Sequence, residues 1–381
     1  MNENEIKNGH SKDIIYVSSI PWDFSWHRQQ EMMSYLAEHG FRVLFVEPCS
    51  KKHPFQKLLR QEKENVWRLR PCGLPYERCL KTVNRLNAQL SRTDIRETAD
   101  RLHFRTPIIW LDRVHGFDFK YFQKNSFVVY DLVDEILAFG RVRNDRMLLD
   151  LENQVLRRAD ILLSSSQMLM ERKIKQSGRD GKSLFLPNGV DCARFKGVSK
   201  KAPADPKKQV VLGFVGNISK RRINYGLIRS IAEDRPQWKL LFVGPGTEED
   251  KEELRRGIRN IEIRNAVPGA KIPDVIREFD VGIIPYNIEK EDMDYVFPRK
   301  ACEYLAAGKP VICMPLKEVE CLKPYVQVVT DAESFIRKAE EVTDENEIAT
   351  EARRTFAQKY DWNFLMKGLV AILSQPDESG T

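Results

Sequence analysis

A lysine and a glutamate stand three residues apart in the segment 297–312. Pro298 suits the first turn of a helix, where its missing N–H costs nothing, and Gly308 suits the left-handed residue after the helix. Lys300 and Glu303 then share one face of that helix. The free N–H groups of the first turn favour an anion beside Lys300, and the Glu303 carboxylate is placed to accept both hydroxyls of a ribose. The spacing therefore fits a nucleotide diphosphate, and an ordinary i,i+3 ion pair is the alternative.

Carboxylates and one histidine follow two apolar segments in the first half of the chain, at 14–17 and 127–130. If both segments are parallel strands, their carboxyl ends share the edge of the sheet where ligands bind. A carboxylate or imidazole at that edge is a candidate general base, and a buried or helix-capping role is the alternative for each aspartate. The candidates for proton transfer are Asp131, Asp134 and His27, and those for contact with an acceptor are Trp22 and Asp23.

Strand and helix patterns alternate along the whole chain. In the first half, apolar strands at 14–17 and 42–46 flank a helical segment at 26–39 that Gly40 ends, and this βαβ unit requires a parallel sheet. The sequence therefore predicts an α/β protein with two Rossmann-like, doubly wound domains facing a cleft, in which a nucleotide would bind. The second half repeats the alternation with strands at 210–215, 238–243, 261–263 and 281–286.

Composition along the chain indicates the domain boundaries. Residues 200–208 combine two prolines with charged residues and contain no large apolar side chain, which is typical of a linker. We expect a first domain at 1–199, a second domain at 200–360 and a terminal helix within 361–381.

A turn containing Gly216 and Asn217 follows the strand at 210–215, and three cations come next in the sequence, Lys220, Arg221 and Arg222. These cations could supply positive charge to a bound ligand, and a solvated basic turn is the alternative. Spacing alone leaves open which of the three cations reaches inward.

Two further segments bear on the ligand. We expect the backbone near Val267 to contact a base. The loop after the first strand has no Gly-x-Gly-x-x-Gly, which counts against a dinucleotide-dependent oxidoreductase. Asp292 and Asp294 have the spacing of a divalent-metal motif, but a polar loop explains them equally well. We therefore expect no metal and no other cofactor.

Composition indicates a globular protein of the cytoplasm. Charged residues make up 31% of the chain and hydrophobic residues 42%, and no run reaches the roughly eighteen apolar residues of a membrane span. The amino terminus lacks the apolar core of a signal peptide. The seven cysteines are scattered and odd in number, so we expect reduced thiols rather than disulfides or a zinc site.

The net charge of +7 is concentrated in residues 51–105, where fourteen Lys or Arg face six Asp or Glu. Between Lys51 and Lys63, cations alternate with Phe55, Leu58 and Leu59. This pattern predicts a helix that lies on an anionic membrane surface, at the inner face of the cell membrane, and a solvated helical face is the alternative. No recognisable fold motif for nucleic-acid binding accompanies the charge.

The segment at 298–311 resembles the donor-binding motif of GT-B glycosyltransferases of the family 4 (group 1) kind. Their pattern is Pro-x-Lys-x-x-Glu-Tyr-Leu-Ala-x-Gly-Lys-Pro-Val, and here it includes Tyr304 and Leu305 as well as Lys300 and Glu303. The resemblance implies a nucleotide-sugar donor, commonly a UDP-sugar, a metal-free site and a last helix that crosses back to the first domain. It also implies that the turn at Gly216 lies under the donor diphosphate, so that Lys220 or Arg221 could supply the positive charge there. Two positions depart from the family: Tyr295 stands where many members have a second glutamate, and Asn217 stands where they have an arginine.

In the first domain, the segments 21–28 and 130–134 look most like the teichuronic-acid and exopolysaccharide glycosyltransferases of bacteria. That likeness implies a saccharide or lipid-linked oligosaccharide acceptor. Three alternatives stay open: a nucleotide-sugar epimerase of the same fold, an oxidoreductase, and a sugar-nucleotide-binding protein without catalysis.

Overall fold

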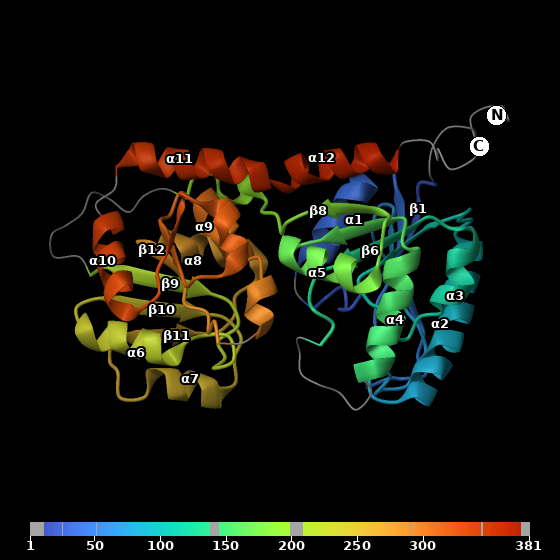
Figure 1. Ribbon diagram of the computed structural model, residues 1–381, viewed down its shortest axis with the longest axis horizontal. Helices are drawn as coiled ribbons and strands as arrows, with labels where there is room; N and C mark the ends of the chain where they lie inside the picture. Colours follow the sequence, from blue (N-terminus) through green and yellow to red (C-terminus); the bar gives the residue numbers. More distant parts are fainter. Residues whose placement is uncertain are drawn as a thin grey trace. The chain divides into compact units, whose positions relative to one another are not determined.

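A computed structural model describes residues 11–24, 26–50, 52–137, 145–198, 209–289, 291–343 and 346–374. The chain divides into two compact units, each built on its own sheet (Figure 1). Unit 1 is Met1–Pro187 with Met366–Thr381, and unit 2 is Asn188–Leu365.

Unit 1 contains an eight-stranded sheet in the order β3-β4-β2-β1-β5-β6-β7-β8. Every neighbouring pair is parallel except β3 and β4, which are antiparallel. The side chains of β1 and β5 are buried along their whole length, as expected for strands covered on both faces. The strands are β1 (Asp13–Val17), β2 (Arg42–Val46), β3 (Leu58–Lys63), β4 (Val66–Arg70), β5 (Ile108–Leu111), β6 (Val128–Leu132), β7 (Ile161–Ser164) and β8 (Lys182–Phe185).

Helices flank this sheet (Figure 1). In α5, the Ser166 hydroxyl accepts a hydrogen bond from Leu169 N at the amino end, and Gly178 adopts the left-handed conformation at the carboxyl end. Both are the expected cap residues. The helices of unit 1 are α1 (Arg28–Glu38), α2 (Lys81–Arg101), α3 (Phe119–Phe122), α4 (Asp145–Arg158) and α5 (Gln167–Ser177).

The prediction of a basic helix at the start of the 51–105 region is wrong. Residues 58–63 form β3, an edge strand that pairs with β4, and a helix begins only at Lys81. Alternating cations and apolar residues also suit an edge strand, because one face packs on the unit while charged side chains discourage pairing with another chain.

Unit 2 contains a six-stranded parallel sheet in the order β11-β10-β9-β12-β13-β14. The two sheets confirm the predicted pair of doubly wound α/β domains. The strands are β9 (Val211–Val215), β10 (Lys239–Val243), β11 (Ile261–Arg264), β12 (Val281–Ile284), β13 (Val311–Cys313) and β14 (Val326–Val328). The helices are α6 (Tyr225–Asp234), α7 (Glu248–Arg255), α8 (Ile272–Arg277), α9 (Arg299–Ala306), α10 (Ala332–Thr343) and α11 (Glu347–Ala357).

The last described helix, α12 (Trp362–Leu373), spans the point at which the two units are divided. Its residues from Met366 on group with unit 1, and Met366, Leu369 and Leu373 are buried. The predicted linker at 200–208 lies outside the described residues.

Candidate functional site

Helix α9 (Arg299–Ala306) lies at the position predicted from the sequence. It begins after Pro298 and ends before Gly308, whose φ of 75° is the left-handed conformation that stops a helix. Tyr304 and Leu305 are fully buried, and the Tyr304 hydroxyl accepts a hydrogen bond from Val215 N at 2.9 Å. Tyr304 therefore connects α9 to the end of β9, and Leu305 belongs to the core of unit 2.

Lys300 extends from the first turn of α9 to the carboxyl end of β9. A side chain added to Gly216 would place its Cβ only 2.2 Å from Lys300 Cε, so the glycine leaves the space that the lysine occupies. The Lys300 ammonium donates a hydrogen bond to the Tyr286 hydroxyl at 3.2 Å and lies 5.5 Å from the centre of the Phe214 ring. Among the described residues, no carboxylate forms an ion pair with Lys300.

The cation of the basic turn that contacts the same aromatic ring as Lys300 is Arg222. Its guanidinium lies 5.4 Å from the centre of the Tyr286 ring. Lys220 instead forms an ion pair with Glu253 of α7 at 2.5 Å, and the side chain of Arg221 is exposed. The predicted donor-binding roles of Lys220 and Arg221 are therefore less well placed than that of Arg222.

Glu303 forms an ion pair with Arg299, one turn earlier in α9, at 3.1 Å. The pairing that the sequence left as an alternative, between Lys300 and Glu303, is not the one in the structure. The Glu303 side chain is 13% exposed. It remains a candidate for two hydroxyls of a ribose.

The turns at the carboxyl ends of β9 and β10 lie close together. A Cβ on Gly244 would meet the Gly216 carbonyl oxygen at 1.9 Å, so both positions require glycine. Asn217 is exposed in this turn, and the loop containing Val267, after β11, is largely exposed. Backbone groups are thus accessible where a phosphate and a base are predicted.

Asp131, at the carboxyl end of β6, is committed to an ion pair inside unit 1. Arg28 Nε lies 3.0 Å from Asp131 Oδ2, Arg28 Nη2 lies 3.0 Å from Asp131 Oδ1, and both residues are buried. The remaining guanidinium nitrogen donates to the carbonyl oxygens of Leu186 and Pro187. These contacts favour the buried-aspartate interpretation over a role as general base.

Asp112, directly after β5, is a carboxylate that the sequence analysis did not single out. It accepts hydrogen bonds from Ser19 N, from Tyr16 Oη at 3.0 Å and from Gln29 Nε2 at 2.9 Å. Burial, with a smaller contribution from the charge of Asp131, raises the pKa of Asp112 to about 7 against the opposing effect of these hydrogen bonds. A carboxylate that titrates near neutral pH is suited to general base catalysis. Its position after the apolar segment 107–111 was a usable signal.

The other predicted residues of unit 1 lie on loops or helix ends. His27 is the N-cap residue of α1, and its ring stacks on Phe24. Trp22 is buried, and its backbone N–H donates to Glu47. Asp23 is exposed and paired with Arg68, and Asp134 is exposed after β6.

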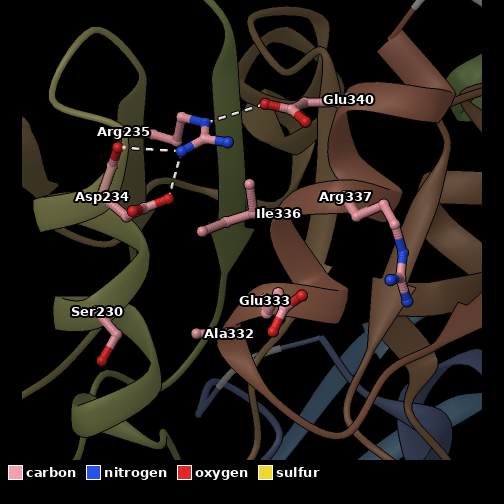
Figure 2. Close-up of a pocket in the computed structure, with 8 residues that line it drawn as sticks. All are labelled: Ser230, Asp234, Arg235, Ala332, Glu333, Ile336, Arg337 and Glu340. Carbon is pink, nitrogen blue, oxygen red and sulfur yellow. Dashed lines mark hydrogen bonds and ion pairs between the residues drawn. The ribbon is translucent and has the colours of Figure 1, made fainter.

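A pocket of about 350 Å³ lies between α6 and α10 of unit 2 (Figure 2). Within it, Arg235 is bonded to Asp234 and, at 2.9 Å, to Glu340. None of the predicted donor-site residues lines this pocket. Its lining residues are Ser230, Asp234, Arg235, Ala332, Glu333, Ile336, Arg337 and Glu340.

The Asp-x-Asp segment lies in a short 3₁₀ helix, Glu291–Tyr295, where Asp294 pairs with Lys317 at 2.6 Å. Across the described part of the chain, no group of three or more His, Cys, Asp or Glu side chains is arranged to hold a metal ion. In the same part, no helix has both the length and the apolar character needed to cross a membrane.

Two units of this kind define the GT-B fold, which solved structures share over nearly the whole chain. Sucrose-phosphate synthase from Thermosynechococcus elongatus matches with a TM-score of 0.72 and 15% identity, covering 94% of this chain and 98% of that one. HepE from Anabaena, solved in complex with UDP, matches with a TM-score of 0.64 and 14% identity, covering 95% and 99%.

Residues 209–345 match the family described as group 1 glycosyl transferases. Over 233 residues the chain is 31% identical to the teichuronic acid biosynthesis glycosyltransferase TuaH of Bacillus subtilis (strain 168). That stretch covers 58% of this chain and 58% of the relative. The likeness to group 1 glycosyl transferases therefore covers the greater part of unit 2.

Proposed function

We propose that this protein transfers a sugar from a nucleotide diphosphate sugar, a UDP-sugar, to a saccharide or lipid-linked acceptor in the synthesis of a cell-surface polysaccharide. The observation that carries the proposal is Lys300. Its ammonium lies against Gly216 at the carboxyl end of β9, without a carboxylate partner among the described residues. A cation at this edge of a parallel sheet is suited to a phosphate-bearing ligand.

Glycosyl transfer needs the leaving diphosphate to be stabilised as the bond to the sugar breaks. In this proposal Lys300, Arg222 and the free N–H groups at the start of α9 supply that stabilisation. Glu303 accepts the hydroxyls of the ribose, and the backbone near Val267 contacts the base.

On unit 1, Asp112 is the carboxylate whose pKa best suits removal of a proton from an acceptor hydroxyl. Asp131 has the role of fixing Arg28, and through it the end of β8. His27 and Asp134 are alternative candidates for proton transfer. Trp22 and Asp23 are candidates for contact with the acceptor.

Two names among the similar proteins support the substrate classes. TuaH carries the description of a teichuronic acid biosynthesis glycosyltransferase, and the HepE structure contains UDP. A polysaccharide acceptor and a UDP-type donor for this chain are inferences from these descriptions together with the cations at the edge of unit 2.

A panel of nucleotide sugars tests the proposal. The sugar that raises the melting temperature most is then incubated, in radiolabelled form, with purified protein and an acceptor extract from bacterial envelopes. We expect label in the polysaccharide or lipid fraction, and none with the Lys300→Met variant. An isomerised sugar formed without acceptor would identify an epimerase instead, and binding with no turnover on any extract would identify a non-catalytic protein.

The basic region 51–105 belongs to the same proposal as a peripheral contact with an anionic membrane, on the cytoplasmic face. The exposed charges of the loops at 52–57 and 71–80 and of the first turns of α2 include Lys52, Lys81 and Arg85, and Phe55 beside them is 74% exposed. Sedimentation with vesicles of phosphatidylglycerol tests this contact. We expect binding that Phe55→Ser weakens and that Ile348→Ser, an equally exposed change in unit 2, leaves unchanged.

A further inference from the structure

Tyr286, just after β12, contacts both cations of the candidate donor site. It is 2% exposed, and its hydroxyl oxygen accepts the hydrogen bond from Lys300. The centre of its ring lies 5.8 Å from Lys300 Nζ and 5.4 Å from the Arg222 guanidinium carbon. One buried ring is therefore in contact with two positive charges.

Backbone hydrogen bonds join the segment containing Arg222 to the segment containing Tyr286. Ile223 and Tyr286 form an antiparallel bridge, and Asn287 N donates to the Arg222 carbonyl oxygen at 2.9 Å. Asn224 N donates to the carbonyl oxygen of the residue before Tyr286 at 2.8 Å. The backbone of Arg222 is thus hydrogen-bonded to the residue after Tyr286, whereas Lys300 reaches the tyrosine from a separate helix.

The two charges are not neutralised locally. In the part of the chain that the structure describes, no ion pair joins Lys300 or Arg222 to a carboxylate. The charges of Lys300 and Arg222 and the hydrogen bond from Lys300 outweigh burial, which acts in the opposite direction, and they bring the pKa of Tyr286 below its usual value. Two like charges held about one neutral ring are stabilised by an anion that contacts both.

We propose that Tyr286 is a positioning residue that holds Lys300 and Arg222 as a two-cation clamp for the diphosphate of the donor. This inference rests on the proposed function and extends it, because it assigns a role to Tyr286, a residue that touches no substrate and that orients the two cations. Two cations that contact one ring suit two linked phosphates better than one. The clamp therefore discriminates diphosphates from monophosphates.

Calorimetric titration with UDP, UMP and inorganic pyrophosphate tests the clamp in the wild type, Tyr286→Phe, Lys300→Met and the double variant. Tyr286→Phe keeps the ring and removes the acceptor of the lysine hydrogen bond. We expect it to weaken UDP and pyrophosphate about tenfold and UMP less, since a hydrogen bond that orients a charged group is lost. The double variant should bind no more weakly than Lys300→Met alone, because the tyrosine acts through the lysine.

Tyr225→Phe is the matched control. Tyr225 lies in the same unit, is also buried, and its hydroxyl donates to the Asp250 carbonyl oxygen at 3.1 Å, so the change removes a comparable hydrogen bond away from the cations. We expect its affinities to equal those of the wild type.

Three results would each overturn the clamp. In the first, Tyr286→Phe weakens the affinities for UDP and UMP equally; in the second, the affinity loss of the double variant is the product of the losses of the two single variants. In the third, Tyr286→Phe binds as tightly as Tyr225→Phe. Pyrophosphate has no base and no sugar, so it separates this inference from the proposed function. Binding of pyrophosphate that depends on Tyr286, with no sugar transferred to any acceptor, would leave the clamp intact and refute the transferase. Sugar transfer with an unaffected Tyr286→Phe variant would do the reverse.

Discussion

The carboxyl edges of the two sheets differ in how their charged side chains are paired. In unit 1 the charged side chains satisfy one another, as Arg28 does with Asp131 and as Arg68 does with Glu47 at 2.9 Å. In unit 2, Lys300 and Arg222 contact an aromatic ring, and no carboxylate of the described segments forms an ion pair with either. Charge that is paired within its own unit contributes to the fold, whereas unpaired charge is available to a ligand. The difference distinguishes Asp131, which is paired within the fold, from Lys300, which we propose binds the donor.

The largest expected effect comes from breaking the pairing in unit 1. Asp131→Ala leaves the buried Arg28 guanidinium without its partner, so we expect unfolding to cost about 3–5 kcal/mol less. Urea denaturation measures the loss. Asp134→Ala, an exposed change three residues later, should stay within about 0.5 kcal/mol of the wild type. An Asp131→Asn protein of full stability that had lost turnover would instead restore Asp131 as a base.

The next effect comes from filling the space beside the unpaired lysine. In Gly216→Ala the new methyl group meets Lys300, and the φ of 152° disfavours any side chain, so we expect a loss of about 1–3 kcal/mol in stability. Donor affinity should fall about a hundredfold, because a charge-assisted contact is displaced.

Gly257→Ala is the control for that variant. Gly257 also has a positive φ, 76°, but a Cβ there would meet nothing within 4 Å. It should lose some stability and keep its donor affinity. A Gly216→Ala protein that bound donor normally would show that Lys300 is not where the ligand is held.

Asp112 gives a smaller effect, which depends on pH. Its pKa is raised to about 7, so the folded state favours the protonated form and its contribution to stability is lost as pH rises from about 4 to 7. Asp112→Asn has no such titration. Allowing for partial exposure, we expect the wild type to lose ~2 kcal/mol more than the variant between pH 4.5 and 8 in chemical denaturation. Parallel pH profiles for the two proteins would contradict the raised pKa.

Glu303→Ala should have the smallest effect on stability. The pair with Arg299 is partly exposed and worth about 0–1 kcal/mol, and the apolar face of α9 is unchanged. Donor affinity should nevertheless fall about tenfold if the carboxylate accepts ribose hydroxyls. If calorimetry showed the same donor affinity for Glu303→Ala and the wild type, Glu303 would not bind the ribose.

The fold follows from local patterns that are visible in the sequence. Apolar runs such as 210–215 and 127–130 can be buried on both faces only in a parallel sheet, and proline and glycine mark the two ends of α9. The segment 51–63 was mispredicted because its alternation of cations and apolar residues fits a helix face and an edge strand equally well. Pairing with β4, a tertiary contact, decides between them.

The part of the candidate site that lies on a single helix, α9, was predictable from the sequence. Lys300 and Glu303 share α9, and their spacing indicated a phosphate and a ribose. The partners of Lys300 come from other elements: Gly216 follows β9 and Tyr286 follows β12. The choice of Arg222 over Lys220 depends on the bridge between Ile223 and Tyr286, which no spacing rule contains.

The most direct test of the central claim is a calorimetric titration of UDP and of uridine into the wild type and Lys300→Met. We predict that the variant keeps its unliganded melting temperature and its affinity for uridine, and loses UDP affinity about a hundredfold, because the ammonium interacts only with the phosphates. Equal UDP affinity in the two proteins would show that the unpaired cation at the carboxyl edge of unit 2 does not bind the donor.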